Sequence, residues 1–292
     1  MSNPRAIPPI ITASGDLLGR YDVLFCDIWG VVHDGVRAFD AANVALTHFR
    51  ANGGTVVLVS NAPMPGETVA RVLDQKGVVR DAWDAIVSSG DLALGIIAER
   101  GWRRIHGIGP QKRDAAFFAA LPGRSDDVRD ADAIACTGLV NDRQETAEHY
   151  RPMLEQALAR KLAFVCANPD LAVHVGDDLL PCAGAIGALY AEMGGEVIWA
   201  GKPHALAYDT AKGVAERLRS STVPSARILA IGDSVRTDLA AAAGAGVDAL
   251  FIVSGIHRDE TMVDGDVSPT KLAALFVNDG PTAVAASIAL RW

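Results

Sequence analysis

The segment LFCDIWGVVHDG (24–35) places an ionisable residue directly after an apolar run. Asp27 follows Phe25 and Cys26, so we expect its carboxylate to emerge at the end of a strand and to be held rigidly in a cleft. A carboxylate held in this way can act as a nucleophile or as a metal ligand. The alternative is an Asp that caps the following turn, and Asp27 taken alone favours that alternative.

The segment IGDSVRTD (231–238) adds two carboxylates five residues apart. Asp233 ends an apolar run and Asp238 lies near the start of a helical pattern, so both can face one cation. Oxygen ligands suit Mg²⁺, which completes its shell with water and substrate phosphate. N-capping by Asp233, Ser234 or Asp238 is the alternative. Together with Asp27, the pair favours a metal site.

Two further apolar runs end in groups that can hold an anion. Lys202 precedes Pro203 at the expected first turn of a helix and could offset the negative charge of aspartates and phosphate. Ser60 and Asn61 end the run VVLVSN, where a hydroxyl and backbone N–H groups can bind phosphate oxygens. The alternatives are a solvated surface lysine and an ordinary turn before Pro63.

These residues need a scaffold that brings four strand ends together. Apolar runs bounded by turn residues predict strands within 21–32, 54–63, 84–89, 161–170, 196–203, 226–234 and 247–255. Helical periodicity separates several of them, at 39–51, 68–76, 146–159, 204–218 and 237–243. This alternation predicts an α/β fold with a parallel sheet covered by helices, and such sheets bind ligands at the carboxyl ends of their strands.

The stretch from 88 to 196 differs in texture and carries strand patterns of its own. We predict that it is an inserted cap domain and that residues 1–87 and 197–292 form the core domain. A cap over an open sheet edge would shield a charged reaction from bulk water.

Composition narrows the classes of function. Half of the 292 residues are hydrophobic, enough for two domains, and no apolar run is long enough to cross a bilayer. The N-terminus lacks a secretion signal, so we expect a soluble, cytoplasmic protein with no membrane partner. The net charge of −8 argues against nucleic acid, and we expect the four cysteines to be buried apolar residues.

Taken in order, these segments resemble the four motifs of the haloacid dehalogenase (HAD) superfamily. The resemblance is closest to class IIA, the NagD-type and p-nitrophenyl phosphatase-like hydrolases, and includes CANPDLAV (166–173), PCAGAIGALYAEMGG (181–195) and GKP (201–203). It covers almost the whole chain. It implies a Rossmann-like core with an α/β cap, Mg²⁺ as cofactor and phosphatase activity on a small phosphorylated metabolite. Class IIA relatives often associate, which implies a homodimer.

The resemblance assigns a role to each motif residue. Asp27 would be the nucleophile and a metal ligand, and would form an aspartyl-phosphate that water later hydrolyses. Asp233 would ligate Mg²⁺ directly, and Asp238 would support it through water. Ser60 and Lys202 would bind the transferring phosphoryl group, and Asn61 would contribute its backbone N–H.

Position 29 departs from the family pattern. Family phosphatases carry a second Asp two residues after the nucleophile, which protonates the leaving oxygen and then activates water. Trp29 has no titratable group near neutral pH, although its backbone carbonyl can still ligate Mg²⁺ as in the family. General acid–base catalysis typically contributes about 10²- to 10⁴-fold. We therefore expect slow turnover or a restriction to good leaving groups.

Several alternatives stay open at this point. His33 or Asp34 could replace the missing acid/base, or both could be plain surface turn residues. The Trp29 indole could stack on a flat substrate or only pack. A dehalogenase-type hydrolase is a second function, because those enzymes also place an aromatic residue at this position, but they need no Mg²⁺. A catalytically impaired protein that binds a phosphometabolite or a protein partner is the third.

Overall fold

The computed structural model describes residues 7–175, 178–276 and 280–292. The chain divides into two compact units, which we describe separately. The first unit contains Met1–Ser60, Ala70–Val87 and Tyr208–Trp292, and the second contains Asn61–Val69 and Ser88–Ala207. Among the helices of the described residues, none combines the length and the apolar character that a membrane span requires.

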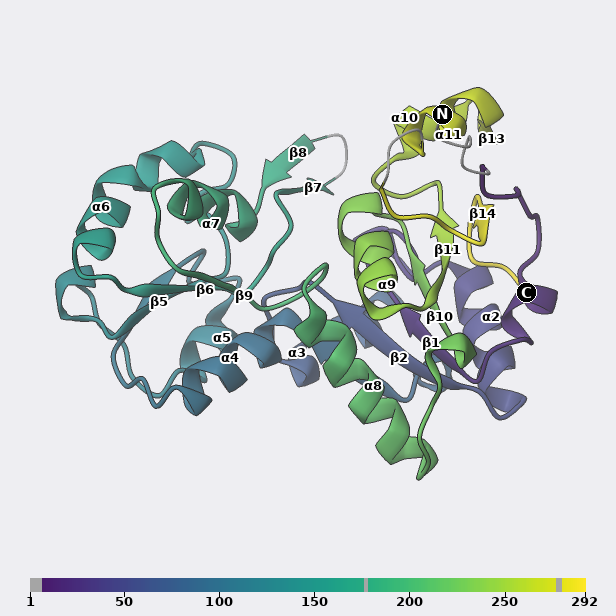
Figure 1. Cartoon of the computed structure of the whole chain (residues 1–292), viewed down its shortest axis with the longest axis horizontal. Coiled ribbons are helices and arrows are strands. Elements are labelled where there is room, and N and C mark those ends of the chain that lie inside the picture. The colour runs from purple at the N-terminus through teal and green to yellow at the C-terminus, as the bar shows by residue number, and fades with distance from the viewer. Residues whose placement is uncertain (1–6, 176–177, 277–279) are drawn as a thin grey trace. The chain divides into compact units, whose positions relative to one another are not determined.

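The first unit is built on a six-stranded sheet in the order β14-β11-β10-β1-β2-β3 (Figure 1). The strands are β1 (Val23–Cys26), β2 (Thr55–Ser60), β3 (Ala85–Ser88), β10 (Ile228–Gly232), β11 (Asp248–Ile252) and β14 (Ala285–Ser287). The pairs that join β2, β1, β10, β11 and β14 are all parallel. Every residue of β1, β2 and β10 is buried, as expected of strands covered on both faces.

The register of this sheet aligns the strand ends that carry chemistry. Cys26, the last residue of β1, pairs with Ile231 on one side and with Leu58 on the other. The carboxyl ends of β10, β1 and β2 therefore lie side by side. The crossover after β1 contains α2 (Asp40–Ala51), whose buried residues Ala42, Ala45, Leu46 and Phe49 recur at helical spacing. The other helices that pack in or lead into this unit are α1 (Gly15–Leu18), α3 (Gly66–Lys76), α8 (Ala205–Arg219), α9 (Ala240–Ala245), α10 (Arg258–Thr261) and α11 (Pro269–Leu275).

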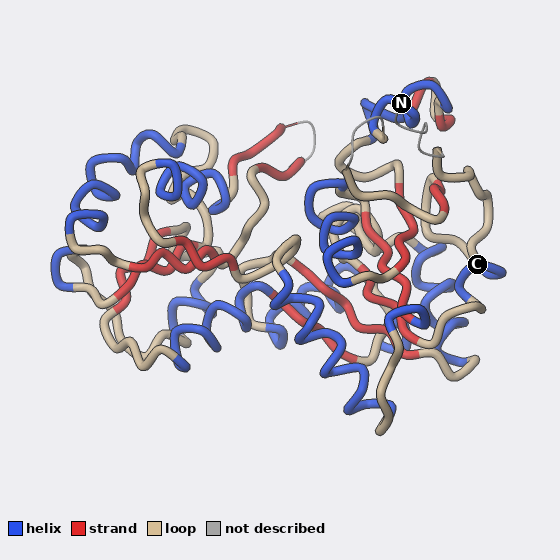
Figure 2. Tube along the Cα trace, viewed as in Figure 1, coloured by secondary structure: helices blue, strands red, loops and turns tan. Residues whose placement is uncertain are grey.

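The second unit has its own parallel sheet, with strand order β4-β5-β6-β9. Its strands are β4 (Ile105–Ile108), β5 (Ala133–Cys136), β6 (Ala163–Cys166) and β9 (Val197–Trp199), and its helices are α4 (Ser89–Glu99), α5 (Ala115–Ala119), α6 (Arg151–Ala159) and α7 (Ala183–Glu192). β7 (Ala172–Val175) pairs antiparallel with β8 (Asp178–Pro181). Figure 2 shows both sheets as red strands among blue helices.

The second sheet extends past the predicted boundary at residue 196. Val197 pairs with Phe164 of β6, so β9 belongs to this sheet and the unit continues to Ala207. An apolar run looks the same in sequence whichever sheet it joins, because only the pairing partner differs.

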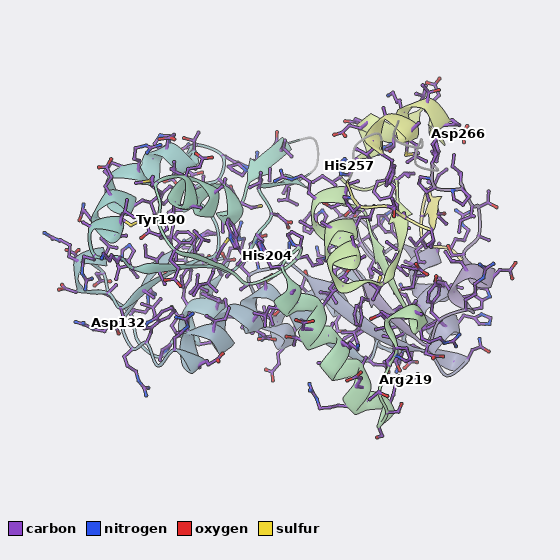
Figure 3. All side chains as sticks on the ribbon, in the orientation of Figure 1. Asp132, Tyr190, His204, Arg219, His257 and Asp266 are labelled. Atoms are coloured by element: carbon purple, nitrogen blue, oxygen red, sulfur yellow. The ribbon has the colours of Figure 1, made fainter. Side chains whose placement is uncertain are left out.

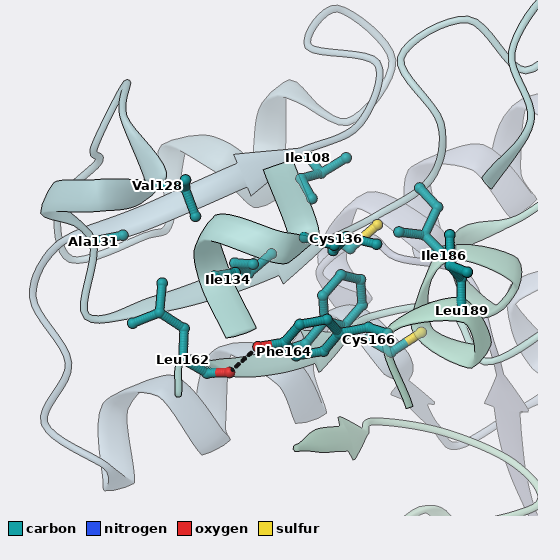
Figure 4. Packing of buried hydrophobic residues seen from close by; sticks show 14 of the residues in the cluster. Ile108, Val128, Ala131, Ile134, Cys136, Leu162, Phe164, Cys166, Ile186 and Leu189 are labelled. Carbon is teal, nitrogen blue, oxygen red and sulfur yellow. Dashed lines mark hydrogen bonds between the residues drawn. The ribbon is translucent and has the colours of Figure 1, made fainter. Parts of the chain in front are cut away.

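One core cluster of the second unit lies between α6, α7 and the sheet (Figure 4), and another packs α4 and α5 on the same sheet. Tyr190 and Phe164 are fully buried there, and the Tyr190 hydroxyl donates a 2.8 Å hydrogen bond to the Leu162 carbonyl. Cys136 and Cys166 pack in the same cluster, and burial raises the pKa of the Cys136 thiol to about 12. All four cysteines of the chain are buried, which confirms the prediction that they act as apolar residues.

The predicted fold class is confirmed, with differences at element ends. The expected strand 21–32 forms only Val23–Cys26, because the chain turns at Gly30, whose φ is +82°. The expected helix 237–243 starts earlier, as one turn of π-helix at Val235–Leu239 that leads into α9. A sequence pattern does not distinguish such a turn from an ordinary helix start.

Candidate active site

Three carboxylates meet at the carboxyl end of the first sheet. One oxygen each from Asp27, Asp233 and Asp238 lie within 4.8 Å of one another, and all three residues are buried. Asp27 follows β1 and its N–H donates to the Ile231 carbonyl at 2.8 Å, while Asp233 follows β10. Adjacent parallel strands therefore bring together residues that are about 200 positions apart in the chain.

Glycines make room for these carboxylates. A Cβ atom at Gly30 would lie 2.1 Å from Asp233 Oδ2, and one at Gly255 would lie 1.9 Å from the same atom. A Cβ at Gly232 would lie 2.1 Å from Asp238 Cγ. Side chains at these positions would displace the carboxylates. The backbone N–H of Ile256 donates to Asp233 Oδ2 at 2.8 Å and fixes its orientation.

The turn after β10 holds Asp238 in place. The N–H of Ser234 donates to Asp238 Oδ2 at 3.2 Å, and the Ser234 hydroxyl accepts from the Thr237 N–H at 3.3 Å. The N–H of Val235 donates to Nε2 of His257 at 3.3 Å, so the loop after β11 braces this turn (His257 is labelled in Figure 3). Ser234 therefore caps the π turn, as the capping alternative expected, while Asp233 and Asp238 still converge.

The donor set fits a divalent cation. Three carboxylates this close repel one another strongly in a buried site unless a positive charge compensates them. All the side-chain ligand atoms are oxygens, the type that Mg²⁺ and Ca²⁺ prefer. The surrounding glycines shape the site around the carboxylates rather than fill it with apolar atoms.

Trp29 packs on the loop that follows β1. Its indole contacts the His33 ring edge to face, with centroids 5.3 Å apart. The φ of Gly35 is +87°, and a Cβ there would lie 2.6 Å from the indole. The Trp29 residue nevertheless remains 38% exposed. One part of the indole therefore packs on the loop, and another part is accessible to a ligand.

His33 is not the surface turn residue that one alternative expected. It is only 3% exposed, and its Nδ1 accepts a 2.9 Å hydrogen bond from the Gly35 N–H. Burial, with a smaller contribution from Lys76, lowers the pKa of His33 to about 4. His33 is therefore neutral near pH 7. Its intrinsic pKa no longer supports a role as the missing general acid.

Asp34 is a turn residue. Its Oδ1 accepts from the N–H groups of Val36 and Arg37, both at 2.8 Å, and its side chain lies at the exposed surface. The backbone hydrogen bond from Arg37, with others from the turn, lowers the pKa of this carboxyl. The plain-turn alternative thus describes Asp34.

In the second unit, Lys202 and Asn61 are bound to each other. The Lys202 N–H donates to Asn61 Oδ1 at 2.8 Å, and Asn61 Nδ2 donates to the Lys202 carbonyl at 3.0 Å. Lys202 is 2% exposed and Asn61 is 6% exposed. The surface-lysine alternative is therefore wrong.

Two residues that sequence reasoning missed complete this cluster. Asp170 Oδ1 accepts from Asn61 Nδ2 at 3.0 Å, and the Ser89 hydroxyl donates to Asn61 Oδ1 at 3.4 Å. A Cβ at Gly201 would lie 2.2 Å from Ser89 Oγ. The glycine of GKP therefore allows the backbone at position 201 to approach the Ser89 side chain. The segment CANPDLAV contained the signal for Asp170, although its pattern did not reveal the partner.

Ser60 is the last residue of β2 in the first unit and is 8% exposed. The next residue in the chain, Asn61, is the first residue of the second unit. The predicted residues thus fall into a carboxylate cluster and Ser60 in one unit, and the Asn61–Lys202 pair in the other.

Comparisons with known proteins agree on one family. A family model described as haloacid dehalogenase-like hydrolase matches residues 24–120, and a second, described as HAD-hydrolase-like, matches residues 199–279. These two ranges include Asp27, Ser60, Lys202 and Asp233.

Solved structures match over nearly the whole chain. A hydrolase of the haloacid dehalogenase-like family from Brucella suis 1330 is 40% identical with a TM-score of 0.83, covering 96% of this chain and 99% of that one. The 4-nitrophenylphosphatase of Thermotoga maritima shares the fold at 23% identity and a TM-score of 0.67, covering 92% of this chain and 95% of that one.

A curated relative matches in part. The chain is 30% identical over 115 residues to the 5'-nucleotidase YutF of Bacillus subtilis (strain 168), which is 39% of this chain and 43% of the relative. The matched part thus spans less than half the length of that relative.

Proposed function

Because the chain belongs to the haloacid dehalogenase-like hydrolase family, we propose that it is a phosphatase that releases phosphate from a small phosphorylated metabolite. The observation that carries this proposal is the buried convergence of Asp27, Asp233 and Asp238 at the end of the first sheet. The names of the relatives, which include a 5'-nucleotidase and a 4-nitrophenylphosphatase, support phosphate esters as the substrate class.

In this proposal Asp27 is the nucleophile. A carboxylate oxygen of Asp27 attacks phosphorus, the bond from phosphorus to the leaving oxygen breaks, and the leaving group departs with the electron pair. Water then cleaves the aspartyl-phosphate, which releases phosphate and restores the carboxylate. The rigid placement of Asp27 by its hydrogen bond to Ile231 limits the motion that attack requires.

The proposed cofactor is Mg²⁺, held by the carboxylates of Asp27 and Asp233 and by the Trp29 carbonyl, with Asp238 supporting it through water. When bound, it would supply the positive charge that lets a carboxylate approach an anionic phosphoryl group. Ser60 and Lys202 are proposed to bind the phosphoryl oxygens, with the Asn61 N–H. The buried hydrogen bonds between Asn61 and Lys202 support a fixed position for the lysine.

Trp29 restricts the substrates of this enzyme. Neither the indole nor the neutral, buried His33 can protonate a leaving oxygen near pH 7. A leaving group must then depart as a stable anion or take its proton from water. We therefore propose a preference for phosphates of acidic hydroxyls, such as phenols, over phosphates of simple alcohols.

The dehalogenase alternative is less well supported. It explains an aromatic residue at position 29 but gives no reason for two further carboxylates beside Asp27. The non-catalytic alternative explains the loss of the acid/base, and the same experiment distinguishes it. Cytoplasmic location and a homodimer stay predictions.

The test is phosphate release from a panel of aryl and alkyl phosphates, with Mg²⁺ and with EDTA. We expect release that requires Mg²⁺, favours aryl phosphates and falls at least 10³-fold in Asp27→Asn, since the amide is not a nucleophile. Asp34→Asn is the matched control, because Asp34 lies in an exposed turn after the same strand.

The alternatives predict other results. No release by wild type across the panel, with binding of phosphate retained, would indicate the non-catalytic alternative. Halide release in EDTA would indicate a dehalogenase. Equal loss in Asp27→Asn and Asp34→Asn would show that the effect of the first variant is not specific.

A further inference from the structure

The first unit has a cavity whose lining includes none of the three carboxylates of the cluster. Its volume is about 450 Å³, and its lining includes the start of α2, the end of α3 and the chain near Arg291. This volume lies within the range of small-molecule sites and exceeds what a single inorganic ion needs. The C-terminal residues lie beside α2 (Figure 1), where Trp292 stacks on His48 with ring centroids 4.2 Å apart.

The lining carries an excess of positive charge. Arg37, Lys76 and Arg291 all line the cavity, against one carboxylate, that of Asp40. Within the described part of the chain, no ion pair joins any of these three cations to a carboxylate. The whole chain has a net charge of −8, so its composition does not account for this gathering of cations. Three like charges around one cavity repel each other, and a multivalent anion between them would remove that cost.

The backbone of the lining adds donors. The N–H groups of Ala42 and Asn43 both donate to the Phe39 carbonyl. In the described residues, the N–H groups of Asp40 and Ala41 donate to no backbone carbonyl, and Phe39 offers no side-chain cap. These donors reinforce an anion site that the three cations already define.

We propose that this cavity binds a small oxyanion, a phosphate-bearing or polycarboxylate metabolite, between the guanidinium groups of Arg37 and Arg291 and the ammonium group of Lys76. Guanidinium forks pair with phosphate and carboxylate oxygens in the same bidentate manner. The three cationic side chains thus indicate an anionic ligand. The cavity volume fits a small molecule better than a single inorganic ion.

The site is coupled to the loop that carries Trp29. The Lys76 ammonium donates to the Gly35 carbonyl, and Gly35 packs directly against the indole. An anion that draws Lys76 toward the cavity changes this hydrogen bond. The ligand therefore acts as a regulator of the Trp29 loop, and this claim does not depend on the phosphatase activity proposed above.

The binding test is calorimetric titration of the full chain with pyrophosphate and, separately, citrate, without divalent metal and at constant ionic strength. We expect the Arg37→Gln/Arg291→Gln double variant to bind citrate at least tenfold more weakly than wild type. Arg217→Gln, an exposed arginine of α8 outside the cavity, should bind as wild type does. Citrate is the probe for a polycarboxylate ligand, and pyrophosphate is the probe for a phosphate-bearing ligand.

The outcomes separate this site from the catalytic one. Asp27→Asn should keep the affinity of wild type for citrate, whether or not it abolishes phosphate release. Identical isotherms for wild type and the arginine double variant with both probes would overturn the proposal. A saturable change in tryptophan emission that is missing in Trp29→Phe supports the coupling, and unchanged emission at saturation overturns the regulatory role.

Discussion

Position 29 shows how one residue can keep a main-chain role and lose a side-chain role. The backbone carbonyl of Trp29 is available to a cation as that of any residue would be. The side chain instead packs on Gly35 and against the ring edge of His33. The two neighbouring candidates for an acid/base are a buried neutral histidine and a carboxylate committed to a turn. Neither His33 nor Asp34 is therefore poised to donate a proton near pH 7.

Restoring a carboxylate at position 29 should restore acid catalysis. We expect Trp29→Asp to raise phosphate release from alkyl phosphates by about a hundredfold and to change release from aryl phosphates much less. Trp29→Phe is the control, because it keeps an aromatic packing partner for Gly35 without adding an acid. Steady-state rates against leaving-group pKa provide the measurement. Equal rate gains for both substrate classes would show that the added carboxylate does not act by protonating the leaving group.

The glycine beside Asp233 should be essential for the metal site. In Gly30→Ala the new Cβ would lie 2.1 Å from Asp233 Oδ2, so we expect the apparent Mg²⁺ affinity to fall at least tenfold. Gly53→Ala is a matched control, because its φ is +86° and no atom lies within 4 Å of the added Cβ. Both variants carry a backbone cost of about 1 kcal/mol from the left-handed conformation. Mg²⁺ titration of activity, with thermal unfolding as a check, separates the two effects.

At the scale of elements, two loops depend on each other for their shape. The loop after β2 begins with Asn61, and the loop after β9 contains Gly201 and Lys202. The Asn61 amide satisfies both the N–H and the carbonyl of Lys202, so one side chain replaces two backbone partners. Buried backbone polar groups without partners are costly, which gives this amide a structural reason to be present.

Asn61 should therefore act as a positioning residue for Lys202. We expect Asn61→Ala to raise KM for phosphate substrates more than tenfold, because Lys202 loses the partner that holds its backbone. Asn52→Ala removes an exposed amide at the end of α2 and should leave KM unchanged. Ser89→Ala removes only the 3.4 Å contact to Asn61 Oδ1 and should have an intermediate effect. A fall in thermal stability with unchanged KM would limit Asn61 to a structural role.

At the scale of the whole molecule, the first unit is assembled from three segments of the chain, which alternate in sequence with the segments of the second unit. β1 and β10 are neighbours although some 200 residues separate them in sequence. Just before these strands, Arg227 forms a bidentate pair with Asp22, at 2.9 and 2.7 Å. Arg219, labelled in Figure 3, donates to the carbonyls of Asp22 and Gly53 and so joins the end of α8 to the starts of β1 and β2.

The pair between Asp22 and Arg227 should make stability depend on pH in acid. The hydrogen bonds from Arg227 hold the pKa of the Asp22 carboxyl below its ordinary value of 3.8. The folded state thus binds this proton less readily than the unfolded chain, so the pair stabilises above pH 3.8 and the contribution is lost as pH falls through the folded pKa.

Both side chains are partly exposed, and solvent screens such pairs, so we expect Arg227→Gln to lower the free energy of unfolding only slightly at pH 7. The difference from wild type should shrink in acid and in high salt. Urea unfolding of both proteins across pH provides the measurement. A difference that stays constant below pH 3.8 would show that the ion pair is not its source.

The fold class and the identity of the chemical groups follow from the amino-acid sequence alone. Apolar runs that end in Asp27 and Asp233 are local patterns, and a parallel sheet requires such strand ends to lie at one edge. That is why the convergence of the carboxylates could be predicted without coordinates. The replacement of an acid by Trp29 is likewise visible in one residue.

Properties that depend on partners distant in the chain become visible only in the folded protein. His33 is buried because other segments cover it, so its lowered pKa could not be inferred from its neighbours in sequence. The pairing of Asn61 with Lys202, 141 residues away, and the membership of β9 in the second sheet have the same origin. Burial, electrostatic environment and pairing are set by what packs nearby, and local pattern records only what a residue could do.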